Sequence, residues 1–234
     1  RNGLRIRDIA SGTERTITPQ LKGMRRVEWA HDSASLLIGG SGLDGKTGLY
    51  RVDLSSGEAS LLAGAELAGF FVPSRDGKTV FYWVHQRGVF ARDLSTGSDK
   101  VLFDRKDLGG RMLLRLSRDA TKLAMCANQY LGVVDLASGQ VRDIYASPKN
   151  SGERIWALDW SADDRQLLTI FRSSGGMEKM EMVIFPAGGG APTRQPISSQ
   201  FRGLSLSPDG KYLGTTRVTR RTQVWALENF LPAK

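Results

Sequence analysis

The sequence predicts an all-β fold made of repeated four-stranded units, and two interleaved motifs carry this prediction. The first motif is an apolar run, a polar turn centred on aspartate, and a second apolar run. It occurs in the segments VEWAHDSASLLI (27–38), FFVPSRDGKTVFYW (70–83), LLRLSRDATKLAMC (113–126), ALDWSADDRQLLTI (157–170) and GLSLSPDGKYLGTT (203–216). The aligned aspartates are spaced 44, 43, 44 and 46 residues apart: Asp32, Asp76, Asp119, Asp163 and Asp209. A period held through five copies indicates a repeat architecture.

Each of these segments is expected to form a β-hairpin. Asp can bond backbone groups two residues further on, and Gly accepts the positive φ that a tight turn requires. The flanking runs are four to six residues long and rich in Val, Leu, Ile and aromatic residues, as short strands are. The aspartates are therefore interpreted as turn residues rather than as a catalytic set of carboxylates.

A second hairpin motif alternates with the first. It appears as DIASG (8–12), DLSSG (53–57), DLSTG (93–97) and DLASG (135–139), with a degenerate copy at 185–190. Each copy follows an apolar or alternating run, and its Gly lies where left-handed geometry is needed. Two hairpins per repeat give four antiparallel strands, called a, b, c and d in chain order.

A repeat of about 40–45 residues with four strands is typical of a β-propeller blade, so we expect an all-β propeller with five to six blades represented. Helices should be nearly absent, since no segment keeps a 3.6-residue period. We expect one domain over residues 1–234. Its full blades would span 21–64, 65–108, 109–152 and 153–198, after trailing strands at 1–20 and before a last blade at 199–234.

Both ends of the sequence carry a predicted strand c. The chain opens with strands c and d of an earlier blade (4–18) and ends with strands a, b and c of a last blade. Either a five-blade ring with one surplus strand forms, or upstream blades are missing; the start in mid-pattern favours missing blades.

The aligned motifs resemble the TolB-like family of WD-repeat-like propellers. SPDGKYL (207–213) matches the core of that family's repeat, and Trp29 and Trp160 occupy its tryptophan position. The resemblance implies a propeller that binds partner proteins, in the C-terminal part of a larger bacterial protein. It also favours a periplasmic or other extracytoplasmic location.

Composition excludes few classes of function. The formal charge of +9 suggests anionic partners, but no run of five like charges occurs, so we do not expect nucleic acid to be the partner. No apolar stretch is long enough for a membrane helix. Cys126, the single cysteine, cannot form an internal disulfide and is expected to be buried. We expect a monomer.

The sequence contains no convincing catalytic, cofactor or metal motif. GSGLDGKT (40–47) matches the phosphate-binding loop literally, but a strand rather than the required helix follows it. His31 and His85 lie in different repeats without a ligand cluster, so no metal is expected. No nucleophile elbow occurs. We predict that the chain alone is not an enzyme and needs no cofactor.

The candidate binding residues are four arginines near the start of the innermost strands. Arg25 and Arg202 lie seven residues before their blade aspartates, and Arg111 and Arg154 lie one and two residues earlier in the repeat. The second blade lacks an equivalent. These side chains could form a cationic collar that attracts an anionic ligand or acidic protein segment at the channel mouth. Solvated or ion-paired arginines are the alternative.

The leading functional hypothesis is a non-catalytic propeller that binds a protein or senses a ligand within a bacterial signalling or envelope protein. One alternative is the accessory propeller of a serine hydrolase of the prolyl-oligopeptidase type. Another alternative is binding of anions or nucleic acid through a basic face.

Overall fold

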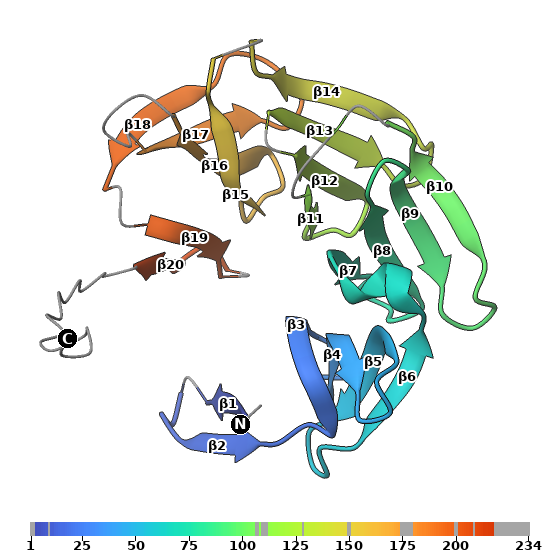
Figure 1. Cartoon of the computed structure of the whole chain (residues 1–234). Helices are drawn as coiled ribbons and strands as arrows, with labels where there is room; N and C mark the ends of the chain where they lie inside the picture. The colour runs from blue at the N-terminus through green and yellow to red at the C-terminus, as the bar shows by residue number, and fades with distance from the viewer. Residues whose placement is uncertain are drawn as a thin grey trace, which may run out of the picture.

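The computed structural model describes residues 3–8, 10–105, 108, 112–127, 129–148, 151–173, 180–198, 201–207 and 209–217. Within these residues the chain forms four four-stranded antiparallel sheets and two two-stranded sheets. The sheets follow one another around an open arc, with the two-stranded sheets at its ends (Figure 1). The all-β propeller prediction is confirmed.

The blades are numbered in chain order. The first contains β3 (Leu21–Trp29), β4 (Ser35–Gly42), β5 (Thr47–Asp53) and β6 (Ala59–Ala63). The second contains β7 (Phe71–Pro73), β8 (Thr79–Val84), β9 (Gly88–Asp93) and β10 (Asp99–Phe103). The third contains β11 (Met112–Leu116), β12 (Lys122–Ala127), β13 (Tyr130–Asp135) and β14 (Val141–Ala146). The fourth contains β15 (Arg154–Trp160), β16 (Gln166–Arg172), β17 (Met180–Pro186) and β18 (Thr193–Ile197).

Hairpins form the two ends of the arc. They are β1 (Leu4–Arg7) with β2 (Glu14–Ile17), and β19 (Phe201–Leu206) with β20 (Leu213–Arg217). The strand c expected after β20 lies outside the described residues. One 3₁₀ turn, η1 (Ala65–Ala68), interrupts the strands of the described chain, in agreement with the expected scarcity of helix.

Strands a of successive blades lie nearest the centre of the arc, and strands d lie at its outside (Figure 1). Because neighbouring strands are antiparallel, the a–b and c–d turns lie at one end of each blade and the b–c and d–a connections at the other. We call these ends the aspartate-turn face and the d–a face.

The repeat aspartates build the turns, as predicted. In the third blade, Asp119 Oδ1 accepts hydrogen bonds from Ser117 Oγ at 2.6 Å and from the Thr121 backbone N–H at 3.0 Å. Asp163 makes the same two bonds with Ser161 and Arg165. These donors favour the charged form, and they lower the pKa of Asp119 to about 2.

The residue after each turn aspartate has left-handed backbone geometry. Two of these positions are Gly, but the other three are residues for which this geometry is strained. The five are Ser33, Gly77, Ala120, Asp164 and Gly210, with φ of 53°, 70°, 58°, 57° and 74°.

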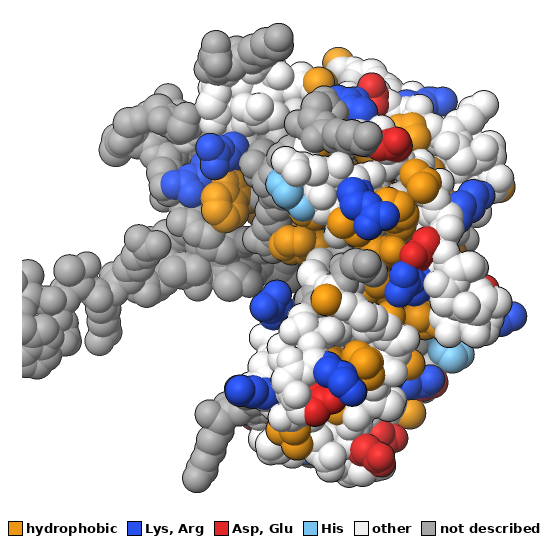
Figure 2. Space-filling view, turned by 45° about the vertical axis from the view of Figure 1, so that its right-hand side comes forward, with side chains coloured by type: hydrophobic (Ala, Val, Ile, Leu, Met, Phe, Trp, Pro, Cys, Tyr) orange, Lys and Arg blue, Asp and Glu red, His pale blue; other side chains and the backbone are white. Residues whose placement is uncertain are grey.

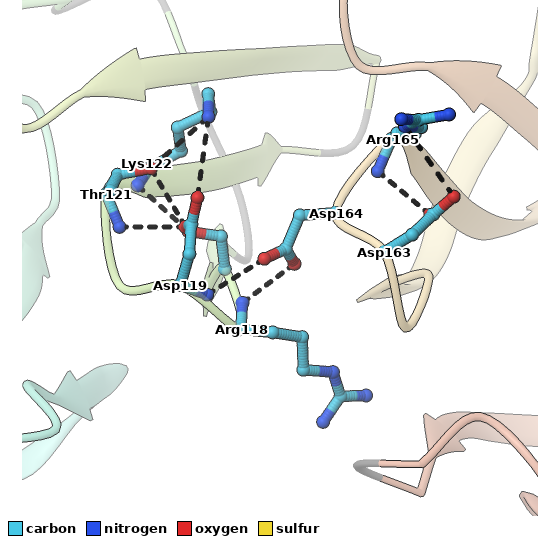
Figure 3. A network of polar contacts seen from close by, with 8 residues as sticks. Arg118, Asp119, Thr121, Lys122, Asp163, Asp164 and Arg165 are labelled. Atoms are coloured by element: carbon cyan, nitrogen blue, oxygen red, sulfur yellow. Dashed lines mark hydrogen bonds and ion pairs between the residues drawn. The ribbon is translucent and has the colours of Figure 1, made fainter.

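Asp164 joins two blades. Both of its carboxylate oxygens accept backbone N–H groups of the third blade's turn, from Arg118 at 2.7 Å and Asp119 at 2.8 Å (Figure 3). Further in, the buried Trp160 indole donates to the Arg115 carbonyl of the third blade at 2.9 Å. Of these two adjacent acids, Asp163 therefore stabilises the turn of its own blade, and Asp164 binds the turn of the neighbouring blade.

We predict that Ala120→Gly stabilises the protein. A left-handed non-glycine residue costs about 1–2 kcal/mol, of which the extra chain entropy of Gly takes back about 0.5–1 kcal/mol. Chemical denaturation should show a gain of roughly 0.5 kcal/mol. Ala137→Gly, in a turn position without positive φ, is the control and should be destabilising. Equal losses in both variants would contradict the strain argument.

A second prediction concerns acid stability. The folded pKa of Asp119 lies below its ordinary value of 3.8, so the turn stabilises the fold above about pH 4 and that contribution is lost as pH falls towards 2. Asp119→Asn should lower the free energy of unfolding at pH 6 and flatten its decline between pH 4 and 2. Urea titrations at both ends of this range measure the effect. An unchanged slope would refute it.

Candidate functional site

The structure describes part of the predicted arginine collar. Arg25 lies inside β3 and Arg154 is the first residue of β15, and both side chains are exposed. The backbone of Arg202 lies in β19, but its side chain and the whole of Arg111 are outside the described residues. Arg25 therefore lies within the innermost strand of the first blade, and Arg202 is the second residue of β19.

Arg25 occupies a β-bulge. The strand pairing steps from Met24 opposite Gly40 to Arg26 opposite Gly39, which leaves Arg25 without a partner position. The same step skips Trp156 in β15 and Arg202 in β19. All three residues lie seven positions before their turn aspartates. Bulges bend a strand and redirect the extra side chain, and they are frequent beside functional sites.

The fourth blade places Trp156, rather than Arg154, at the position equivalent to Arg25. Arg154 instead lies directly across from Arg172 in the sheet. The Arg172 guanidinium lies over the Trp156 ring, 5.3 Å from its centroid. Two like charges directly opposite each other in a sheet repel. The cation–π contact between Arg172 and the Trp156 ring offsets part of that repulsion. The fourth blade thus contributes a cluster of two arginines and a tryptophan, of which sequence reasoning found only Arg154.

A cavity of about 300 Å³ adjoins this cluster, but its own charges are balanced. Arg194 forms ion pairs with Glu181 at 2.9 Å and Glu153 at 3.2 Å, and it lies 5.2 Å from the Phe171 ring centroid. Tyr145 Oη donates to Glu153 at 2.5 Å. Arg25 and Arg154 are exposed and form no ion pair with another described residue.

Charge is mixed over the rest of the visible surface. On the side shown in Figure 2, Lys and Arg lie scattered with Asp and Glu between them, rather than gathered into one continuous basic patch. This arrangement agrees with the spread of basic residues along the sequence. It does not have the concentrated positive stripe typical of nucleic-acid-binding domains.

The described residues contain no group of three His, Cys, Asp or Glu side chains that could hold a metal ion. His31 packs over Gly77 of the second blade's turn, and His85 makes an edge contact with Trp83. The phosphate-loop match at 40–47 joins antiparallel strands β4 and β5, without the helix that phosphate binding requires. Cys126 is buried, as expected.

No helix in the described part of the chain has the length and apolar character needed to cross a bilayer.

The chain matches no family model, and no curated protein sequence matches it. Solved structures do resemble it. TolB from Acinetobacter baumannii has a TM-score of 0.67 at 20% identity, with 90% of this chain aligned to 53% of that one. The β-propeller domain of Myceliophteria thermophila Swd1 has a TM-score of 0.60 at 15% identity, covering 92% of this chain and 65% of that one.

An enzyme is among the similar structures. Dipeptidyl peptidase 4 from Porphyromonas gingivalis has a TM-score of 0.56 at 11% identity, over 83% of this chain and 36% of that one. The chain spans about half the length of the TolB structure. At these identities the likeness concerns the fold alone. The resemblance expected from the sequence is confirmed at that level: the chain has the β-propeller fold seen in TolB and in WD-repeat-like propellers.

Proposed function

We propose that this chain is a non-catalytic propeller module that binds an anionic ligand or an acidic segment of a protein partner. It would do so as part of a larger bacterial signalling or envelope protein. The observation that carries the proposal is the shared bulge of the innermost strands, which holds Arg25, Trp156 and Arg202 at one repeat position.

The residue types at this position suit recognition. Trp and Arg are enriched among the residues that contribute most to binding energy, because they combine large contact area with specific polar contacts. Exposed guanidinium groups at the mouth of a ring concentrate the electrostatic field there and attract anions. Arg154 and Arg172 would extend the cationic surface around Trp156, with Arg111 completing the collar in the third blade.

The proposal predicts that charge reversal at the collar abolishes binding without unfolding the chain. Partner proteins retained by the immobilised chain are identified and each is then tested in purified form. Arg25→Glu/Arg154→Glu should weaken binding at least tenfold, and adding Arg111→Glu and Arg202→Glu should remove it. Circular dichroism and the thermal midpoint establish that the variants fold.

A matched control separates the collar from overall charge. Lys78 and Lys211 lie in a–b turns on the aspartate-turn face, and Lys78→Glu/Lys211→Glu makes the same change in net charge. This variant should bind normally. Unchanged binding in the quadruple arginine variant, or equal loss in the control, would exclude a collar.

A second candidate function is the accessory propeller of a serine hydrolase, which the similarity to dipeptidyl peptidase 4 favours. The chain alone would then show no turnover, and the full-length protein would hydrolyse peptide substrates. Hydrolysis by the full-length protein that is lost on removing this propeller would favour this candidate over a purely binding role.

A further inference from the structure

The inner part of the first blade has an apolar face that no described strand covers. Trp29 and Trp160 occupy the same position of the repeat, three residues before their turn aspartates, and Val27 and Leu158 lie two residues earlier. Trp160 and Leu158 are 0% and 1% exposed, whereas Trp29 and Val27 are 53% and 39% exposed. The inner strand of the first blade therefore lacks, among the described residues, the neighbour that the inner strand of the fourth blade has.

The fourth blade shows what covers this face elsewhere in the repeat. Leu158 and Trp160 belong to an apolar cluster that they share with Leu113 and other residues of the third blade. The Trp160 indole also donates its hydrogen bond to the Arg115 carbonyl, and Arg115 lies in β11, the inner strand of the third blade. The cover is therefore the a–b hairpin of the preceding blade, which supplies both apolar contacts and a backbone acceptor.

Only the outer half of such a neighbour is described before the first blade. Val27 pairs with Ile38, and Trp29 pairs with Leu36. Directly opposite side chains point to the same face of a sheet, so these four share one face. Leu36 and Ile38 are buried in a cluster that contains Ile17 of β2. The β1–β2 hairpin carries the motif that joins strands c and d in the complete blades, so strands c and d cover the outer part of this face and leave the inner part open.

The edge of β1 is open on the same side. β1 pairs with β2 and with no other described strand, whereas strand b pairs with this edge of strand c in the complete blades. In the first three blades the third residue after the a–b aspartate lies opposite the c–d aspartate, as Lys122 lies opposite Asp135. A strand b added to β1 would therefore place that residue opposite Asp8. The hairpin at the other end of the arc, β19–β20, packs on the fourth blade through Leu204 (Figure 1).

We propose that Val27, Trp29 and the edge of β1 form a binding site for a β-hairpin with the a–b pattern of the repeat, carried by the same protein outside residues 1–234. Strand b of this hairpin adds to β1. Strand a brings the carbonyl of the residue four positions before its own aspartate to the Trp29 indole, as Arg115 does for Trp160. This site is independent of the arginine collar.

Two arguments select this occupant. An unpaired strand edge beside a large exposed aromatic side chain is a surface that binds an added strand. In the second, third and fourth blades, moreover, the same face packs against the a–b hairpin of the preceding blade. The repeat therefore indicates the chemistry of the occupant: two short apolar strands joined by an aspartate turn.

The test supplies such a hairpin in cis. A copy of residues 112–127, the hairpin that covers Trp160, is fused in front of Arg1, so that Leu4 follows the copy at the spacing of Leu131. The extended chain should have a higher thermal midpoint than the parent chain. Trp29→Ala should lower the midpoint by at least about 5 °C in the extended chain, where the indole is buried, and by less than half as much in the parent. Equal shifts in the two chains would overturn the proposal.

A matched extension tests whether the contact is specific. It carries Leu113→Asp and Cys126→Asp in the copied hairpin only, at two paired positions whose side chains face the fourth blade in the third-blade sheet. In the extension these side chains would face Trp29, so the gain in thermal midpoint should disappear. A gain that survives both changes would exclude this site, and so would an unaltered extension that lowers the midpoint.

Measurements on the parent chain distinguish the other occupants. Iodide quenching of Trp29, taken as the difference between the parent chain and Trp29→Phe, should show an accessible indole. Protection at every protein concentration would mean that β19–β20 of the same molecule covers the face. Protection that appears only at high concentration, together with a faster-sedimenting species, would assign the face to a second copy of the chain. Either result would overturn the proposal.

Discussion

Every full blade of this protein is apolar on both faces, so no sheet can be stable without a neighbour on each side. In β12, Leu123 and Met125 belong to the cluster shared with the second blade, while Ala124 and Cys126 belong to the cluster shared with the fourth. All four residues are at most 1% exposed. Burial at this level contributes about 1.5–3 kcal/mol for a large side chain, and it requires two partners. The arc of blades follows from this requirement.

Polar contacts between blades set the register of that packing. The Trp160 indole donates a hydrogen bond to the Arg115 carbonyl, and Asp164 accepts the backbone N–H groups of Arg118 and Asp119. The Asp159 carboxylate accepts the Leu206 backbone N–H at 2.7 Å. Such bonds add modest stability but are costly to leave unmade, so they fix which groups face each other. The bulge of the innermost strand recurs at the same repeat position in β3, β15 and β19.

The turns and the order of strands could be predicted from the sequence because they depend on local chemistry. Asp119 and Asp163 bond donors within a few residues, and those donors are visible as neighbouring Ser, Thr and backbone positions. The bulges at Arg25 and Trp156 could not be predicted, because they arise from how β3 and β15 fit their partner strands. The position of Arg172 could not be predicted for the same reason, because only the pairing of β15 with β16 places it opposite Arg154. The sequence did contain one signal of the bulge, since Arg25 and Arg202 both lie seven residues before a turn aspartate. Trp156 lies at the same distance from Asp163, and the strand pairing shows that it shares the bulge.

The sandwiching of β12 between two blades has a practical consequence for the single thiol. Cys126 is 1% exposed and packs against the fourth blade, so a thiol reagent can reach it only after the third and fourth blades separate. Its rate of modification under native conditions therefore reports the free energy of opening that one interface. Cys126 is therefore an internal probe of the interface between the third and fourth blades, and no second cysteine complicates the measurement.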